Sequence, residues 1–430
     1  MTIQPSFRKS CVCRLTVSVV IASSLGITAA APAQSIRYGV TDLGTIDSSL
    51  SLSFRGRTIN DTNQVAGFIY GIGGWPHSFF WDDGTMTDIG TLGGPITFAR
   101  GMNNDGSIVG SSDTAGVPQH AILFTGGELY DLGTLGGVHS SARDINDSGQ
   151  IVGSSQRPEP DHYSHAFLLD NGRMTDLGTL GGAYSEAHGI NAAGDVVGMA
   201  WNASSDGRAT HWPAETLEPI DLGSLAGVEG HSTAQDINDL GQIVGNSKTG
   251  LLDADTYHAM LWENGQMTDL GLLPEAGEGM GPYGPPMVFT TAEAINDAGI
   301  IVGNSLPAAD SPDGLRFGPF VYTNDHMTNL NDLLLAADSS WRISNAEDIN
   351  ASGVIVGTAY TPEDNHARAV ILTPVEVPLG DLNGDFVVGI TDFLQLLGAW
   401  GPCDGCLEDL DLDDTVGITD FLILLGNWTA

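Results

Sequence analysis

Short apolar stretches of four to six residues alternate with polar turns over most of the chain. In one unit the stretches ARDIN (142–146) and QIVGS (150–154) meet at the turn NDSG, and HAFLL (165–169) and RMTDL (173–177) meet at DNG. Asp or Asn followed by Gly between two such stretches is typical of a tight β-hairpin. Apolar residues at the 3.6-residue spacing of a helix are absent from this sequence region. The pattern therefore predicts pairs of short antiparallel strands.

The same unit recurs along residues 36–374 and carries three marks. The first is an Asn turn that leads into an apolar strand ending in Gly, and its Asn is Asn60, Asn103, Asn146, Asn191, Asn238, Asn296 and Asn350. The second is a His-Ala-Phe-like stretch with His77, His120, His165, His258 and His366. The third is Asp-Leu/Ile-Gly, with Asp42, Asp88, Asp131, Asp176, Asp221 and Asp269, and with Asn329 as a degenerate seventh. Four short strands per unit of this length are typical of a propeller blade.

The order of these marks predicts how the array of units closes. A lone YGVTDLG (38–44) precedes the first Asn turn, and no Asp-Leu-Gly stretch follows HARAVILTP (366–374). The last unit thus lacks its fourth strand, while the N-terminus carries a spare one. Pairing of the two would close the ring and remove its exposed strand edges. We predict a mainly β protein, with a seven-bladed β-propeller of four-stranded repeats over 36–374, closed by the N-terminal strand.

A different pattern occupies residues 381–430, after a short Pro-bearing linker at 375–380. VGITDFL occurs there twice, 28 residues apart, and each copy follows an acidic loop and begins an apolar stretch with helical spacing. Side-chain oxygens at loop positions 1, 3, 5 and 12, with a backbone carbonyl at 7, match the calcium loop of an EF-hand. The predicted ligands are Asp381, Asn383, Asp385, Val387 and Asp392 in the first loop, and Asp409, Asp411, Asp413, Thr415 and Asp420 in the second.

The two loops predict two Ca²⁺ sites of unequal strength. Position 6 of such a loop makes a sharp turn and is usually Gly, but Phe386 and Asp414 stand there. Because Asp tolerates a left-handed backbone better than Phe, we expect the second loop to bind calcium more tightly. The apolar faces of the two helices that follow the loops are expected to pack on one another.

Both parts of the chain resemble known families. The HAF, DLGTLGG and IN-x-x-G-x-I-V-G marks resemble the bacterial extracellular HAF repeat family, which implies a secreted protein and no particular chemistry. Residues 380–430 resemble a type I dockerin. This resemblance implies a module that binds a cohesin domain on a scaffold or cell surface, commonly to attach polysaccharide-degrading enzymes. Loop positions 10 and 11 help choose the partner in that family, and they are Ile390-Thr391 and Ile418-Thr419 here.

The net charge argues against a nucleic-acid partner, and the N-terminal residues predict secretion. The chain has 15 Lys and Arg against 53 Asp and Glu, a net charge of −38, so phosphate backbones would repel it and we expect no nucleic-acid partner. Basic residues at 8–14, an apolar run at 15–30 and Ala31-Pro32-Ala33 predict a secretory signal peptide over 1–33, cleaved near Ala33. The apolar run is too short for a membrane span, and we expect none elsewhere.

Only two cysteines, Cys403 and Cys406, lie outside the predicted signal peptide. Secretion exposes them to an oxidising compartment, so we expect them to form a small local disulfide. Two cysteines are too few for a structural zinc site.

The sequence singles out no catalytic constellation: G-x-S-x-G, H-E-x-x-H and the P-loop are all missing. The His and Asp of the repeat marks recur once per unit, so we interpret them as a buried hydrogen-bonded pair rather than as an acid and a base. We predict a secreted, non-catalytic binding or scaffold protein. Its C-terminal module would bind two Ca²⁺ and a cohesin-like or cell-surface protein, and its propeller would present a face to carbohydrate or protein.

Two alternatives stay open. One is a polysaccharide-degrading O-glycosyl hydrolase on a tethered propeller, which would need two carboxylates in the blade loops. The other is a structural spacer at the cell surface. The insertions at 272–292 and 304–317 are where a ligand site would most readily differ from the repeats.

Overall fold

The computed structural model describes residues 35–46, 53–70, 75–116, 118–227, 230–250, 256–273, 289–306, 318–361, 364–403, 406–411, 413 and 415–429. The predicted signal peptide over 1–33, its cleavage site and most of the two insertions lie outside these residues. Within them the protein is mainly β. The part of the chain that is described contains no helix long and apolar enough to cross a membrane.

The described strands of the repeat region form four-stranded antiparallel sets, here numbered sheets 1 to 7. Sheet 1 contains β2 (Ser53–Ile59), β3 (Val65–Tyr70), β4 (His77–Asp82) and β5 (Thr85–Asp88), and sheet 2 contains β6 (Gly93–Met102), β7 (Ile108–Thr114), β8 (Gln119–Thr125) and β9 (Glu128–Asp131). Sheet 3 contains β10 (Ser140–Ile145), β11 (Ile151–Gln156), β12 (Ser164–Asp170) and β13 (Arg173–Asp176), and sheet 4 contains β14 (Gly181–Ile190), β15 (Val196–Asn202), β16 (Gly207–Trp212) and β17 (Ile220–Asp221).

Sheets 5 and 6 are joined by one parallel pair, Tyr257 with Phe289. Sheet 5 contains β18 (Ser232–Ile237), β19 (Ile243–Lys248), β20 (Tyr257–Glu263) and β21 (Gln266–Gly271), and sheet 6 contains β22 (Phe289–Ile295), β23 (Ile301–Leu306), β24 (Gly318–Thr323) and β25 (His326–Asn329). Sheet 7 contains β26 (Arg342–Ile349), β27 (Ile355–Thr361), β28 (Asp364–Val377) and β1 (Ser35–Asp42). The 3₁₀ helices η1 (Leu330–Leu333) and η2 (Ala336–Asp338) connect sheets 6 and 7.

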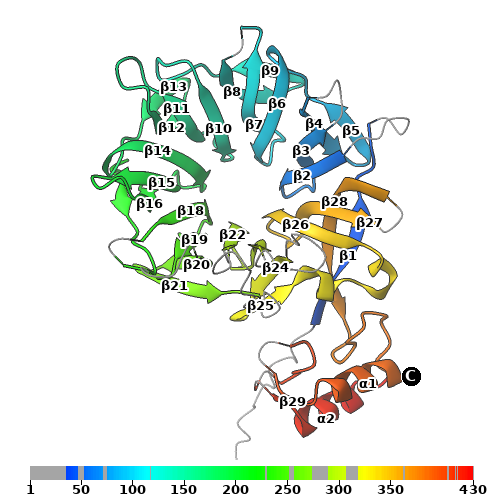
Figure 1. Ribbon diagram of the computed structural model, residues 1–430. Coiled ribbons are helices and arrows are strands. Elements are labelled where there is room, and N and C mark those ends of the chain that lie inside the picture. The colour runs from blue at the N-terminus through cyan, green and yellow to red at the C-terminus, as the bar shows by residue number, and fades with distance from the viewer. Residues whose placement is uncertain are drawn as a thin grey trace, which may run out of the picture. The chain divides into compact units, whose positions relative to one another are not determined.

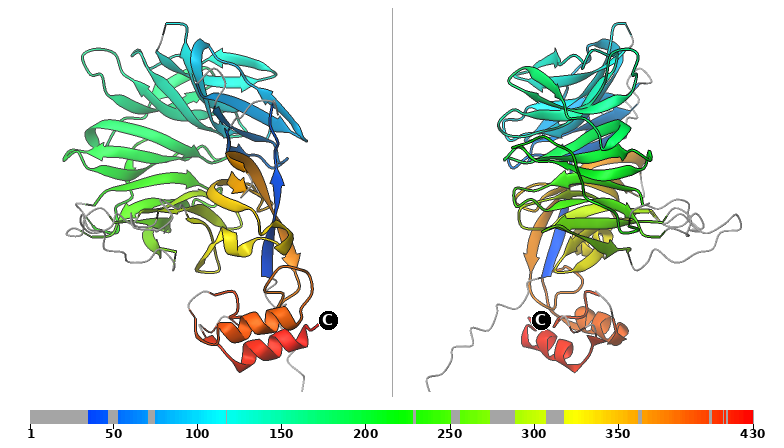
Figure 2. Two further views of the ribbon diagram at one scale, coloured as in Figure 1. Left: turned by 45° about the vertical axis from the view of Figure 1, so that its right-hand side comes forward. Right: turned by 90° about the vertical axis from the view of Figure 1, so that its left-hand side faces the viewer.

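The N-terminal strand completes the last sheet. β1 pairs antiparallel with β28, with Tyr38 opposite Pro374 and Asp42 opposite Val370. Figures 1 and 2 show the blue β1 beside the orange β28. This pairing agrees with the spare-strand prediction, but it extends further. Residues 375–377, predicted as linker, belong to β28 and pair with residues 35–37, so only 378–380 lie between the last strand and the first loop.

The sheets are arranged around a common centre (Figure 1). The first strands, β2, β6, β10, β14, β18, β22 and β26, contact one another in this order, and β26 contacts β2 in turn. Apolar side chains fill the space between neighbouring sheets. Phe54 and Phe79 of sheet 1 share a buried cluster with Val356 and Ile371 of sheet 7, so the packing continues across the two ends of the repeat region.

The Gly that ends each apolar stretch allows the first two strands of a sheet to approach closely. In sheet 3 a bulge lies between Ala142 and Asp144, opposite Gly153. A Cβ on Gly153 would lie 2.1 Å from the carbonyl oxygen of Ser141, so no larger residue fits without a backbone shift.

The C-terminal residues fold into two short helices, α1 (Ile390–Gly398) and α2 (Ile418–Gly426), with a small ladder between β29 (Gly401–Pro402) and β30 (Thr415–Val416). Their core contains Leu382, Val388, Leu396, Val416 and Leu424. Phe393 and Phe421 contact each other at 5.4 Å between ring centroids.

Candidate functional site

The seven Asn of the first repeat mark form a ring of hydrogen bonds between sheets. Each side-chain Oδ1 caps its own turn; that of Asn146, for example, accepts from the backbone N–H of Ser148 at 3.1 Å and of Gln150 at 3.0 Å. Each Nδ2 donates to the backbone carbonyl of the Asn in the next sheet, at 3.0–3.3 Å. The last of these bonds joins Asn350 to Asn60 at 3.1 Å. The asparagines are buried.

This asparagine ring surrounds a cavity of about 240 Å³. The residue after each ring Asn also lines it: Asp61, Asn104, Asp147, Ala192, Asp239, Asp297 and Ala351. Several of their side chains form hydrogen bonds with one another. Asn104 Nδ2 donates to both Asp61 and Asp147 at 3.0 Å. Asp239 Oδ1 accepts the N–H of Ala192, and Asp297 Oδ1 that of Asp239. Their oxygens are thus used in linking neighbouring turns.

Three half-buried aspartates add a second set of links between sheets. Asp144, Asp236 and Asp348 each accept the N–H of the next residue and a second N–H from the following sheet. Burial raises the pKa of Asp236 to about 7, helped by the charges of Asp144 and Asp348. Burial likewise raises the pKa of Asp348 to about 6. These groups are structural, because both oxygens are engaged with backbone donors.

A further set of side chains, here called the charged layer, was not singled out by the sequence analysis. Three positions before each ring Asn stand half-buried side chains: Arg57, Arg100, Arg143, His188, Gln235, Glu293 and Glu347. Arg57 forms an ion pair with Glu347, and Arg143 Nε donates to Glu186 Oε1 at 2.7 Å. Burial opposes ionisation of Glu186, but hydrogen bonding and charge from His188, with Arg143 and Tyr184, hold its pKa well below the usual range. A fixed offset from the Asn mark would have identified this layer.

The His and Asp of the other two repeat marks pair at the outer end of the sheets. His77 bonds Asp88 at 2.9 Å, and the equivalent pairs are His120–Asp131, His165–Asp176 and His258–Asp269. Each Asp also accepts the N–H of the following Gly, as Asp176 does from Gly178 at 2.8 Å. The pairs recur as predicted, but the prediction that they are buried is wrong for most, since only His165 is buried. In sheet 4 Arg208 replaces the His and bonds Asp221.

The first acidic loop of the C-terminal module is held by its own carboxylates. Asp381 accepts the N–H of Gly384 at 2.8 Å through Oδ1 and that of Phe386 at 2.8 Å through Oδ2. Asp392 accepts from Leu382 at 2.8 Å and from Gly389, at the start of α1, at 2.9 Å. Position 1 and position 12 are thereby fixed at the two ends of the loop. Asn383 and Asp385 contact each other at 3.1 Å, and Val387 N–H donates to Asp385.

The second loop repeats this arrangement and brings more carboxylates together. Asp420 accepts from Leu410 at 2.7 Å and from Gly417 at 2.7 Å, and Asp409 accepts from Asp413 N–H. Asp409, Asp411 and Asp413 each offer a carboxylate oxygen, and these oxygens lie within 4.8 Å of one another. Thr415 begins β30.

The second loop also contains an unsatisfied acceptor. Asp411 Oδ1 is buried without a hydrogen-bond partner among the described residues. Burial and the charges of Asp420 and Asp413 raise the pKa of Asp411. A hard divalent cation would satisfy this oxygen and relieve the repulsion, so these residues fit calcium.

Position 6 of the first loop is strained. Phe386 has φ 67°, in the left-handed region that side chains other than Gly, Asn and Asp seldom adopt. The corresponding Asp414 lies outside the described residues, so the predicted difference in affinity between the loops stays a prediction.

The helices carry apolar residues beyond those that pack together. Leu396 and Leu424 are fully buried between them, whereas Ile390 is 61% exposed and Ile418 is 69% exposed. With Leu394, Leu397 and Trp400, or with Leu422, Leu425 and Trp428, these two define matching exposed stripes. The helices therefore pack on one another as expected, but part of their apolar surface stays exposed. Cys403 and Cys406 form a disulfide beside α1, with 5.8 Å between their Cα atoms.

Comparison with known proteins reveals distant likeness in fold only. No protein-family model matches the chain, and no curated protein matches it. A puromycin-hydrolyzing peptidase of Mycobacterium tuberculosis has 12% identity and a TM-score of 0.48, covering 76% of this chain and 51% of its own. The β-propeller domain of the Trilobed protease from Pyrococcus furiosus has 12% identity and a TM-score of 0.45, covering 65% and 83%. A lectin of Aleuria aurantia in complex with Fucα1-6GlcNAc has 11% identity and a TM-score of 0.36, covering 63% and 92%.

The chain thus spans about half the length of that peptidase. Similarity at this level assigns neither an activity nor a ligand to the chain.

Proposed function

We propose that this is a secreted, non-catalytic attachment and binding protein. Its repeat region is a closed seven-bladed β-propeller that presents a ligand-binding face. Its C-terminal residues form a dockerin-like module that binds two Ca²⁺ and docks on a cohesin-like or cell-surface partner.

The carboxylate cluster of the second loop is the observation that carries the calcium proposal. Asp409, Asp411 and Asp413 converge, and the buried Asp411 Oδ1 has no other partner among the described residues. Calcium prefers six to eight hard oxygens, and the carbonyl of Thr415 and the carboxylate of Asp420 are the further donors of this loop in sequence. Bound Ca²⁺ would supply charge that holds the loop closed and so would fix α2 in place.

Closure of the propeller is supported by three independent contacts. β1 pairs with β28, the asparagine ring returns from Asn350 to Asn60, and sheets 1 and 7 share one buried cluster. A closed ring leaves few exposed strand edges, which suits a protein that displays a rigid binding face outside the cell.

The exposed helix stripes support a docking role for the module. Ile390 and Ile418 occupy loop position 10, which helps choose the partner of a dockerin, and both side chains are more than half exposed. Exposed apolar stripes of this kind are typical of protein-binding surfaces. Because both copies carry Ile-Thr at positions 10 and 11, a partner could bind in two related orientations.

Calcium titration of the chain without its signal peptide, followed by calorimetry, tests the module. We expect two binding events in the parent protein. Asp385→Ala should remove the first-loop event and Asp411→Ala the second, because each deletes one carboxylate ligand without touching the helix-capping Asp392 or Asp420. Asp239→Ala, at the central cavity, is the matched control and should keep both events. Absence of any binding event in a folded chain would overturn the calcium and attachment proposal.

A further inference from the structure

Three arginines occupy equivalent positions on three consecutive sheets. Arg57, Arg100 and Arg143 lie on β2, β6 and β10, each three residues before a ring Asn. Since a strand rises about 3.3 Å per residue, this layer lies roughly 10 Å from the asparagine ring. The corresponding positions of sheets 6 and 7 carry Glu293 and Glu347. The layer is therefore positive on one side and negative on the other.

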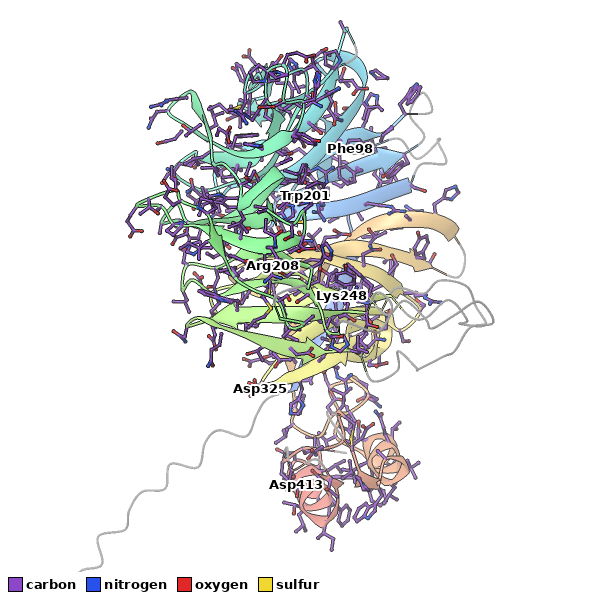
Figure 3. All side chains as sticks on the ribbon, turned by 60° about the vertical axis from the view of Figure 1, so that its left-hand side comes forward. Phe98, Trp201, Arg208, Lys248, Asp325 and Asp413 are labelled. Atoms are coloured by element: carbon purple, nitrogen blue, oxygen red, sulfur yellow. A yellow bond between two sulfur atoms is a disulfide. The ribbon has the colours of Figure 1, made fainter. Side chains whose placement is uncertain are left out.

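Of these arginines, Arg57 and Arg143 have carboxylate partners, whereas Arg100 has none among the described residues. Arg57 pairs with Glu347, and Arg143 pairs with Glu186. Arg100 forms no hydrogen bond or ion pair with any of the residues that the structure describes, and its Nε is buried without a partner. The Arg100 Cζ lies 6.0 Å from the centroid of the Phe98 ring. Figure 3 marks Phe98 on the same strand.

An unpaired guanidinium in this position is unfavourable without a ligand. Burial lowers the pKa of Arg100 to about 9, and the neighbouring charges of Arg143 and Arg57 add to this effect. Buried charges in proteins are normally paired. The chain has 53 acidic residues, yet Glu186, whose charge acts on Arg100, is shared by Arg143 and Tyr184.

We propose that Arg100 is the centre of an anion-binding site, flanked by Arg57 and Arg143, which takes the carboxylate of an acidic sugar. This inference rests on the binding role proposed for the propeller and names the ligand class. The planar guanidinium forms two parallel hydrogen bonds to a carboxylate, so the unpaired donors of Arg100 match this group.

The surroundings favour a sugar over a bare inorganic anion. Phe98 packs edge-to-face on Phe68 at 5.2 Å, and Tyr184 lies 5.6 Å from Trp201, between ring centroids. Aromatic faces suit the apolar side of a sugar ring. Arg57 and Arg143 remain 28% and 27% exposed, so solvent reaches the flanks of the site.

Calorimetric titration with glucuronate, glucose and sulfate tests this site in the chain without its signal peptide. Glucuronate and glucose share one ring and differ in the carboxylate, so we expect saturable binding of glucuronate and none of glucose. Arg100→Gln should weaken glucuronate binding at least tenfold. Arg173→Gln is the control for charge, because Arg173 is exposed on β13, and it should bind as the parent does.

Stability separates a binding role from a structural one. If Arg100 serves a ligand, Arg100→Gln should leave the unliganded melting temperature unchanged or raise it, because an unpaired charge is removed. Binding of sulfate alone would keep the anion site but overturn the sugar. No saturable binding of either anion, or undiminished binding by Arg100→Gln, would overturn the site. Calcium binding by the C-terminal loops should not change in these variants, so failure of the anion site and failure of the attachment proposal are distinguishable.

Discussion

Asn350 donates a hydrogen bond from Nδ2 to the carbonyl of Asn60 at 3.1 Å and so joins residues 290 positions apart. The same bond links Asn103 to Asn146 within the array, over 43 positions. Because the two bonds have the same donor and acceptor atoms, the bond between sheets 7 and 1 is the same contact that joins all other neighbouring sheets. It needs no residue outside the repeat. Its entropic cost differs, since it closes the longest loop of any bond in the asparagine ring.

Asn350→Ala should destabilise the protein by about 1–3 kcal/mol. The variant loses the bond to Asn60 and leaves the N–H of Ser352 and the buried N–H of Val354 without their side-chain acceptor. Urea unfolding followed by fluorescence measures the difference. Asn103→Ala tests the same bond inside the array, and Asn104→Ala, one residue along and exposed, is the control that should cost less than about 1 kcal/mol. Equal stability of Asn350→Ala and the parent would contradict a sealed ring.

Gly153→Ala should destabilise the protein more than most surface changes do. The new Cβ would lie 2.1 Å from the Ser141 carbonyl oxygen, so β10 and β11 must separate and lose ladder hydrogen bonds. We expect a loss of about 2–4 kcal/mol, measured by urea unfolding. Gly250→Ala, where no atom lies within 4 Å of the added Cβ, should change stability little. An unchanged free energy of unfolding in Gly153→Ala would mean that the bulge between Ala142 and Asp144 shifts to make room for the Cβ.

The repeat made the strands of the fold predictable. ARDIN and QIVGS became β10 and β11, and HAFLL and RMTDL became β12 and β13, because each stretch has a turn signal at its end. The lone stretch at 38–44 predicted the pairing of β1, because the last unit lacks a fourth strand. This count needs no knowledge of how the sheets pack. The linker boundary was wrong, since Pro378 stops the strand while Val375 and Val377 continue it.

The central site could not be predicted in the same way. Each Asn mark was recognisable as a turn, but its bond to the next sheet depends on how sheets rotate around the centre. The charged layer was hidden for a related reason. Arg57, Arg100 and Arg143 are 43 residues apart and look like ordinary strand residues until the ring places them side by side. Which of them lacks a partner depends on Glu347 and Glu186, from other sheets.

Phe386→Gly should tighten calcium binding at the first loop. Phe386 has φ 67°, and the left-handed conformation costs a side chain roughly 1–2 kcal/mol, which Gly avoids. We expect affinity for calcium to rise by about threefold to tenfold, measured by calorimetry. Phe386→Ala is the control, since it removes the same ring but keeps a Cβ at the position with positive φ, and it should change the affinity less. An unchanged affinity in Phe386→Gly would show that the strain is the same with and without the ion.

Three carboxyls near the asparagine ring predict how the stability of the protein depends on pH. Burial raises the pKa of Asp236 and of Glu293 to about 7 and that of Asp348 to about 6. A raised pKa means that the folded state holds protons which the unfolded state has released. Stability from these groups is therefore fully present below about pH 4 and declines as the pH rises through their folded values.

Asp236→Asn should flatten this decline. Between pH 5 and pH 8 the parent should lose stability, with a share on the order of 2 kcal/mol from Asp236. The variant cannot ionise at this position, so its loss over the same interval should be smaller by that share, whatever its absolute stability. Urea unfolding at several pH values, at constant calcium, gives both curves. Asp239→Asn, an exposed neighbour beyond the ring, should follow the parent curve. A variant curve parallel to that of the parent would mean that Asp236 is equally protonated in the folded and unfolded states, and that its two backbone donors, Ile237 and Ile295, offset its burial.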